Sequence, residues 1–129
     1  MSDSPRLSYE YVVLRCVPRV DREEFVNVGV VLHCQMAEFL GVAWHVDRDR
    51  LQAFDPRVDA DQVCDSLAYV DAICSGHPSV GAPAVAPITQ RFGFLKAPRS
   101  TVIQPGPVHG GVTTDPARQL EHLLHQLVG

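Results

Sequence analysis

The segment FVNVGVVLHC, residues 25–34, restricts the fold more than any other part of the chain. From Val28 to Leu32 it contains only valine, leucine and glycine. A strand with one face in water alternates between apolar and polar residues, whereas a nearly continuous apolar run is typical of a strand covered on both faces. We therefore expect a sheet strand here, with other elements packed on it. A single asparagine, Asn27, interrupts the run, and three charged residues come just before the segment.

Three further segments have the composition of strands. Residues 9–17 are rich in tyrosine and valine, and they end at Pro18, which has no amide hydrogen to donate to a strand ladder. Residues 38–46 form the third expected strand and residues 99–104 the fourth. The first three follow one another closely, so we expect them to be neighbours in an antiparallel sheet. The segment PGPVHGGVTT, residues 105–114, is expected to be a loop.

Two helices have the clearest signals. Asp59 is placed to cap a helix over residues 59–75, whose apolar side chains share one face, and Gly76 suits its carboxyl end. Asp115 is placed to cap the last helix, with Pro116 in the first turn and a stripe of leucines behind it. Shorter helices are expected over residues 47–54 and 88–97, and a single helical turn near Asp21, which has capping-box spacing to Glu24.

These elements predict a single α+β domain over residues 1–129. An antiparallel sheet of about four strands packs against the two main helices, which cover at least one of its faces. A chain of 129 residues has the length of one ordinary domain. Residues 76–87 hold three prolines and two glycines, and we expect them to form a flexible linker.

Charge and cysteine content restrict the class of protein. The net charge of −4 disfavours a nucleic-acid binder, which needs a basic face. The sequence has no apolar run of the roughly 20 residues that cross a bilayer and no signal peptide at its start, so we expect a cytoplasmic protein with no membrane partner. The four cysteines, Cys16, Cys34, Cys64 and Cys74, have no metal-type spacing. We interpret them as small buried side chains, and we expect neither a metal site nor a cofactor.

The charged run Arg22, Glu23 and Glu24 has two interpretations. Acidic side chains favour the first turn of a helix, so the run can simply be a cap. Arg15 interrupts the first strand as Asn27 interrupts the second, and a buried arginine almost requires a carboxylate partner. Glu23 or Glu24 is the nearest candidate. Arg15, Glu24 and Asn27 therefore belong either to a structural network or to a site.

A second polar cluster lies late in the chain. The segment RFGFLKAPRST contains Arg91, Lys96, Arg99, Ser100 and Thr101, and His109 follows beside two glycines. Guanidinium groups, hydroxyls and backbone amides made accessible by glycine are the groups that bind anions. We therefore weigh an anion pocket formed by Arg99, Ser100, Thr101 and His109 against an ordinary polar loop. The sequence lacks phosphate-loop, dinucleotide-binding and zinc-protease motifs.

Two stretches of the sequence resemble a known family. They are YEYVVLRCVPRVDREEFVNVGVVLHC and FGFLKAPRSTVIQPGPVHGGVTTDPARQLEHLL. The chain resembles, over nearly its whole length, the bacterial family known as domain of unknown function 3037. The resemblance implies a small cytosolic bacterial protein without an established activity, and it implies a HipA-like kinase-fold protein as partner.

The family motifs also indicate positions for a site. Their polar positions fall on Arg15, Arg22, Glu23, Glu24, Asn27, Arg99, Ser100, Thr101 and His109. Gly110 stands where the family pattern has threonine or serine, so a site that depended on that hydroxyl would be weaker in this chain.

Two functions from different classes are consistent with these observations. The first is a non-catalytic accessory or binding module, favoured because no nucleophile–base pair can be assembled from the sequence. The second is a small enzyme that acts on a phosphorylated or carboxylate substrate, with His109 as general acid–base. The second hypothesis requires Arg15, Glu24, Arg99 and His109 to converge on one cleft.

Overall fold

The computed structural model describes residues 5–81, 85–97 and 101–129. In these residues it contains one five-stranded antiparallel sheet and four helices. The strands are β1 (Leu7–Cys16), β2 (Val26–Cys34), β3 (Phe39–Trp44), β4 (Ile103–Pro105) and β5 (His109–Thr113). The helices are α1 (Arg48–Phe54), α2 (Ala60–Ser75), α4 (Ile88–Lys96) and α5 (Pro116–Leu127). Three short 3-10 turns are η1 (Val20–Arg22), η2 (Gln35–Ala37) and η3 (Pro78–Val80).

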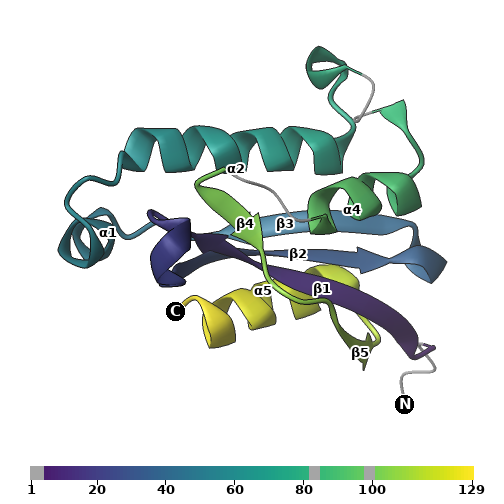
Figure 1. Ribbon diagram of the computed structural model, residues 1–129. Helices are drawn as coiled ribbons and strands as arrows, with labels where there is room; N and C mark the ends of the chain where they lie inside the picture. The colour runs from purple at the N-terminus through teal and green to yellow at the C-terminus, as the bar shows by residue number, and fades with distance from the viewer. Residues whose placement is uncertain (1–4, 82–84, 98–100) are drawn as a thin grey trace.

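Helices cover both faces of the sheet. Figure 1 shows α2 and α4 on one face and α5 on the other. The buried residues form two apolar clusters, one between the sheet and α2 with α4, and one between the sheet and α5. The α+β class is therefore confirmed. The expectation of two main helices is incomplete, because α4 buries Phe92 and Leu95 in the same cluster as α2.

Strand β2 lies inside the sheet and is covered on both faces, as its apolar run predicts. Every residue of β2 is buried except Asn27. From Val30 to Leu32 its side chains alternate between the two clusters, with Val31 facing α2, and Val30 and Leu32 facing α5. Val28 also faces α2, because it is the extra residue at a bulge in the ladder with β1. The continuous apolar run is thus two interleaved apolar faces on one strand.

Strand β1 pairs with three other strands. The sheet order is β3-β2-β1-β4, and β5 also pairs with β1. On one edge β1 binds β2, and on the other it binds β5 along its first half and β4 at its end. The expected fourth strand over residues 99–104 is present only in part, as β4. Thr101 and Val102 form a bend before it, and residues 99 and 100 lie outside the described residues.

The expected loop over residues 105–114 is wrong for residues 109–113, which form β5. Gly111 explains the error. It lies opposite Tyr9, and a β-carbon at this position would be 2.4 Å from the hydroxyl oxygen of Tyr9. Glycine is rare in strands, so the sequence does not predict one here. In the structure, however, Gly111 lets the Tyr9 ring lie against the β5 backbone.

The capping predictions for the two main helices are confirmed. The side chain of Asp59 accepts hydrogen bonds from the amides of Asp61 and Gln62, and Gly76 ends α2 with a φ of 73°. The side chain of Asp115 accepts from the amide of Arg118 at the start of α5. The helical turn near Asp21 is the 3-10 turn η1.

Arg91 connects the two ends of the segment 76–87. Its guanidinium group donates to the carbonyl oxygens of Ile73 and Cys74 at the end of α2, at 3.0 and 2.8 Å, and to that of Ala86 at 2.8 Å. A cation at a helix carboxyl end satisfies carbonyl groups that have no partner within the helix. Arg91 therefore joins α2 and α4, and this role explains its place in the late basic cluster.

No helix in the described residues has the length and apolar character needed to cross a bilayer.

The cysteines behave as small core residues. Cys16, Cys34 and Cys74 are buried, Cys64 is half-buried, and all four are free thiols. Burial disfavours the thiolate and raises the pKa of Cys16 to about 11, with a smaller contribution from the nearby Asp55 carboxylate. Burial likewise raises the pKa of Cys74 to about 12.

We expect Cys64 to be the thiol that reacts readily in the folded protein. Titration with a disulfide reagent at pH 8 should modify one thiol under native conditions and four in denaturant, because the reagent does not reach buried thiols. The variant Cys64→Ser is the control and should show no fast thiol. The raised pKa of Cys16 also makes stability depend on pH. The buried neutral thiol stabilises the folded protein fully below pH 9, the pKa of an unburied thiol, and this stabilisation is lost as the pH rises toward 11. Fast reaction of two or more native thiols would contradict this assignment.

We expect Gly111→Ala to destabilise the protein by about 1–3 kcal/mol, because the added methyl group would overlap the buried ring of Tyr9. Gly110→Ala is the matched control in the same strand, since its β-carbon would be 3.5 Å from the nearest atom, which is ordinary contact. Urea unfolding of the two variants measures the difference. Equal stabilities would show that Tyr9 does not depend on a glycine at position 111.

Candidate functional site

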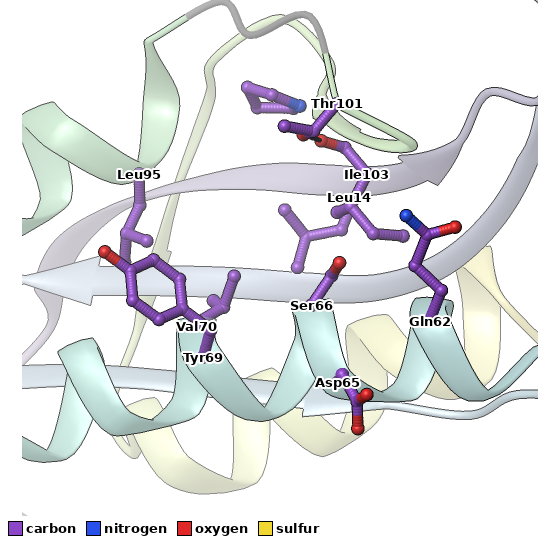
Figure 2. A pocket seen from close by; sticks show the side chains of 10 residues that line it. Leu14, Gln62, Asp65, Ser66, Tyr69, Val70, Leu95, Thr101 and Ile103 are labelled. Carbon is purple, nitrogen blue, oxygen red and sulfur yellow. Dashed lines mark hydrogen bonds between the residues drawn. The ribbon is translucent and has the colours of Figure 1, made fainter. Parts of the chain in front are cut away.

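A cavity of about 320 Å³ opens between α2 and the edge of the sheet formed by β1 and β4. We refer to it as the α2–β4 cavity, and Figure 2 shows its lining. The lining residues are Leu14, Gln62, Asp65, Ser66, Tyr69, Val70, Leu95, Thr101, Ile103 and Pro105. They come from β1, α2, α4, β4 and the segment just before β4, so the cavity is formed by parts of the chain that are distant in sequence.

The walls of the α2–β4 cavity are apolar. Leu14, Val70, Leu95 and Ile103 line it, and all four are at most 5% exposed and belong to the core cluster beneath α2. The cavity is therefore a place where the core between α2 and the sheet opens to the surface. An apolar group that entered it would leave water as completely as a core side chain does.

The polar lining comes mainly from one side of α2. Gln62, Ser66 and Tyr69 are spaced four and three residues apart, which places them along one side of the helix. In Figure 2 the Ser66 hydroxyl points toward Leu14, whereas the Asp65 carboxylate points away from both. The side chains of Gln62, Ser66 and Tyr69 form no hydrogen bond with another described residue, so their polar groups are available to a bound molecule.

Thr101 lies across the cavity from α2. Its hydroxyl donates to the carbonyl oxygen of Ile103 at 2.8 Å, and its own carbonyl accepts from the Gln104 side chain at 3.2 Å. These two bonds make a compact turn before β4. Thr101 is therefore held in place by its own neighbours and is positioned at the cavity by β4.

A charged surface continues from the cavity. Gln62 and Thr101 also line a second hollow, together with Arg19, Asp55 and Arg57. Each arginine has a carboxylate partner two residues away in sequence: Arg19 with Asp21 at 2.8 Å and Arg57 with Asp55 at 3.0 Å. The hydrogen bond from Arg57 lowers the pKa of Asp55. The charges of these two arginines are therefore neutralised locally, and the described residues give this surface no excess of positive charge with which to bind an anion.

Two of the predicted site residues, Arg15 and Asn27, are neighbours in the sheet. They are opposite each other in the β1–β2 ladder, next to a register shift between Leu14 and Arg15 at which β2 has one extra residue, Val28. The Arg15 guanidinium lies 4.0 Å above the ring of Phe25, and the Asn27 side chain donates to the carbonyl oxygen of Leu127 at 3.1 Å. A cation over an aromatic face is a favourable arrangement.

The expected carboxylate partner of Arg15 is wrong. Glu24 pairs with Arg22 at 3.0 Å on the exposed surface, and no described carboxylate forms an ion pair with Arg15. The aromatic ring of Phe25 takes the place of the expected counter-ion. The close approach of Gly106, where a β-carbon would be 3.0–3.1 Å from the guanidinium atoms of Arg15, completes its surroundings.

The other predicted site residues lie in different surroundings. His109 is exposed and lies opposite Tyr11 in the β1–β5 ladder, with the two rings 5.3 Å apart. Tyr11 is four residues from Arg15 along β1, which corresponds to about 13 Å. Thr101 lines the α2–β4 cavity, and Glu24 lines a charged hollow with Arg22. The predicted residues Arg99 and Ser100 lie outside the described residues.

Gln62, Ser66 and Tyr69 are not among the site residues predicted from the sequence. Their helix was predicted, and its apolar face was interpreted as core. The available signal was two hydroxyl groups and an amide at helical spacing directly beside the apolar stripe. Polar residues flank the apolar stripe of any surface helix. They indicate a binding site only when the strand that lies beside the helix is known. Among the described residues, no group of three or more histidine, cysteine or acidic side chains is arranged to hold a metal ion.

Comparison with known proteins gives one match. A family model with the description "Protein of unknown function (DUF3037)" matches residues 11–128, which is nearly the whole chain. No curated protein and no solved structure matches the chain. The match includes every strand and helix described above except the first residues of β1. The chain therefore belongs to the DUF3037 family.

Proposed function

We propose that this protein is a non-catalytic binding module, and that the α2–β4 cavity receives an apolar side chain from a protein partner. The observation that carries the proposal is the chemistry of the cavity: a core-like apolar interior beside hydroxyl and amide groups that bond to no other described side chain or backbone group. Binding sites commonly combine an apolar pocket with a few polar groups that fix the orientation of the ligand.

The size of the cavity supports this proposal. Its volume of about 320 Å³ lies at the lower end of the range of roughly 300–1,000 Å³ found for ligand pockets. An engineered apolar cavity of about 150 Å³ already binds benzene. An aromatic or large aliphatic side chain therefore has enough room, and Ser66, Tyr69 and Gln62 can bond to the backbone that carries it.

We propose a HipA-like kinase-fold protein as the partner, as the family resemblance implies. The locally neutralised ion pairs next to the cavity suit a polar rim around an apolar anchor, which is the usual arrangement of a protein interface. The alternative, an enzyme with an Arg/His anion pocket, has less support. Arg15, Glu24 and His109 contact different neighbours, and the two described arginines beside the cavity, Arg19 and Arg57, already have carboxylate partners.

We expect N-acetyl-phenylalaninamide, a capped amino acid with an apolar side chain, to bind weakly and saturably in the α2–β4 cavity. Amide NMR signals of α2 around Ser66 and of Thr101 should shift during a titration, because they border the cavity. The variant Ser66→Phe should abolish these shifts, since the new ring would fill the space beside Leu14.

The matched control is Ala68→Phe, which adds the same ring at an exposed position of α2 that does not line the cavity. This variant should keep the wild-type shifts. If the probe causes no saturable shifts, or if Ser66→Phe and wild type respond alike, the cavity does not receive an apolar side chain.

A further inference from the structure

Strand β3 leaves one edge of the sheet open. It is the last strand in the order β3-β2-β1-β4, and its only described strand partner is β2. Its sequence, FLGVAW, contains no charged residue and no proline. Proteins usually protect an open edge with charges, proline, a bulge or a covering segment, because unpaired backbone groups are a template for another strand. The described part of this chain places none of these protections within β3.

The direction of the free backbone groups follows from one hydrogen bond. The amide of His45 donates to the carbonyl oxygen of Val28 at 2.9 Å, so this pair of residues is a hydrogen-bonded pair of the β2–β3 ladder. In antiparallel ladders such pairs alternate with pairs whose backbone groups point outward. Leu40, Val42 and Trp44 therefore direct their amide and carbonyl groups to the open edge.

We propose that this edge binds the same edge of a second copy of the chain. The two β3 strands pair antiparallel across a two-fold axis at Val42, so that the two sheets become one. In this register Val42 lies opposite Val42 of the second copy, and Leu40 lies opposite Trp44 of the second copy. All three outward-facing residues of each copy then exchange backbone hydrogen bonds.

The side chains favour a second copy as the occupant. Leu40, Val42 and Trp44 lie on the α2 side of the sheet and pack against its core cluster while remaining partly exposed. The two-fold axis would extend this apolar row across the junction, on the same face in both copies. Since β3 has no charged side chain, the antiparallel arrangement brings no like charges together within the paired segment. Self-complementary contact of this kind is what a two-fold dimer requires.

Cysteine cross-linking tests the register. In a hydrogen-bonded antiparallel pair the α-carbons are about 5.5 Å apart, within the range of a disulfide. We expect Val42→Cys to form a disulfide-linked dimer on mild oxidation. Leu40→Cys is the matched control on the same strand and face, since two copies of Leu40 would be more than about 13 Å apart. Equal cross-linking of the two variants, or none in Val42→Cys, would overturn the proposal.

Sedimentation velocity tests the dimer without a cross-link. We expect the wild-type chain to dimerise with increasing concentration, and Val42→Lys to weaken the dimer by about tenfold or more, because two lysines would meet at the axis. Val112→Lys is the control, as it makes the same change on β5 at an exposed position. A wild-type chain that stays monomeric, or a Val42→Lys variant that dimerises as the wild type does, would rule out this interface. If Val42→Lys does not fold, the cross-linking experiment still tests the dimer. Ser66→Phe leaves the β3 edge unchanged, so the binding-cavity proposal and the dimer proposal can fail separately.

Discussion

The burial of β2 on both faces is the constraint on which the rest of the structure depends. A fully buried valine or leucine side chain contributes roughly 1.5–3 kcal/mol, and β2 places such side chains alternately against α2 and against α5. Neither helix alone would satisfy the strand. Helix α2 extends past β2 to the short strand β4, where the sheet supplies only three residues. The α2–β4 cavity lies where α2 extends beyond the part of the sheet that can pack against it, because β4 is only three residues long.

Local signals in the sequence were sufficient for most of the fold. The apolar run of β2, the capping residues Asp59 and Asp115, and Pro116 each act within a few residues of their position, so their effect is readable from the sequence alone. Strand β5 was not readable in this way. Its glycines have low strand propensity, and Gly111 is suited to its place only because the ring of Tyr9, about a hundred positions earlier, lies against it.

The site was harder to predict because it depends on partners that sequence distance hides. Arg15 was expected to find the nearest carboxylate, but Glu24 pairs with Arg22 at the surface, where little desolvation is needed. The aromatic ring of Phe25, adjacent to that glutamate, is the group that reaches Arg15. Similarly, Ser66 and Tyr69 line a cavity only because Thr101 and Ile103 lie opposite them. The helical pattern of α2 does not indicate those two residues. The proximity of Arg15 to Asn27, in contrast, followed from the pairing of adjacent strands.

The return of β4, β5 and α5 to β1 and β2 has a consequence for how the chain is made. During synthesis the first two strands emerge long before the last helix, so Val30, Leu32 and Cys34 have no cover until Leu120 and Leu123 are available. Contacts between the two ends of a chain form slowly, because a large loop must close first. The nascent chain therefore exposes this apolar face of the sheet until residues 116–127 have been synthesised, and we expect its risk of aggregation to be greatest during that interval.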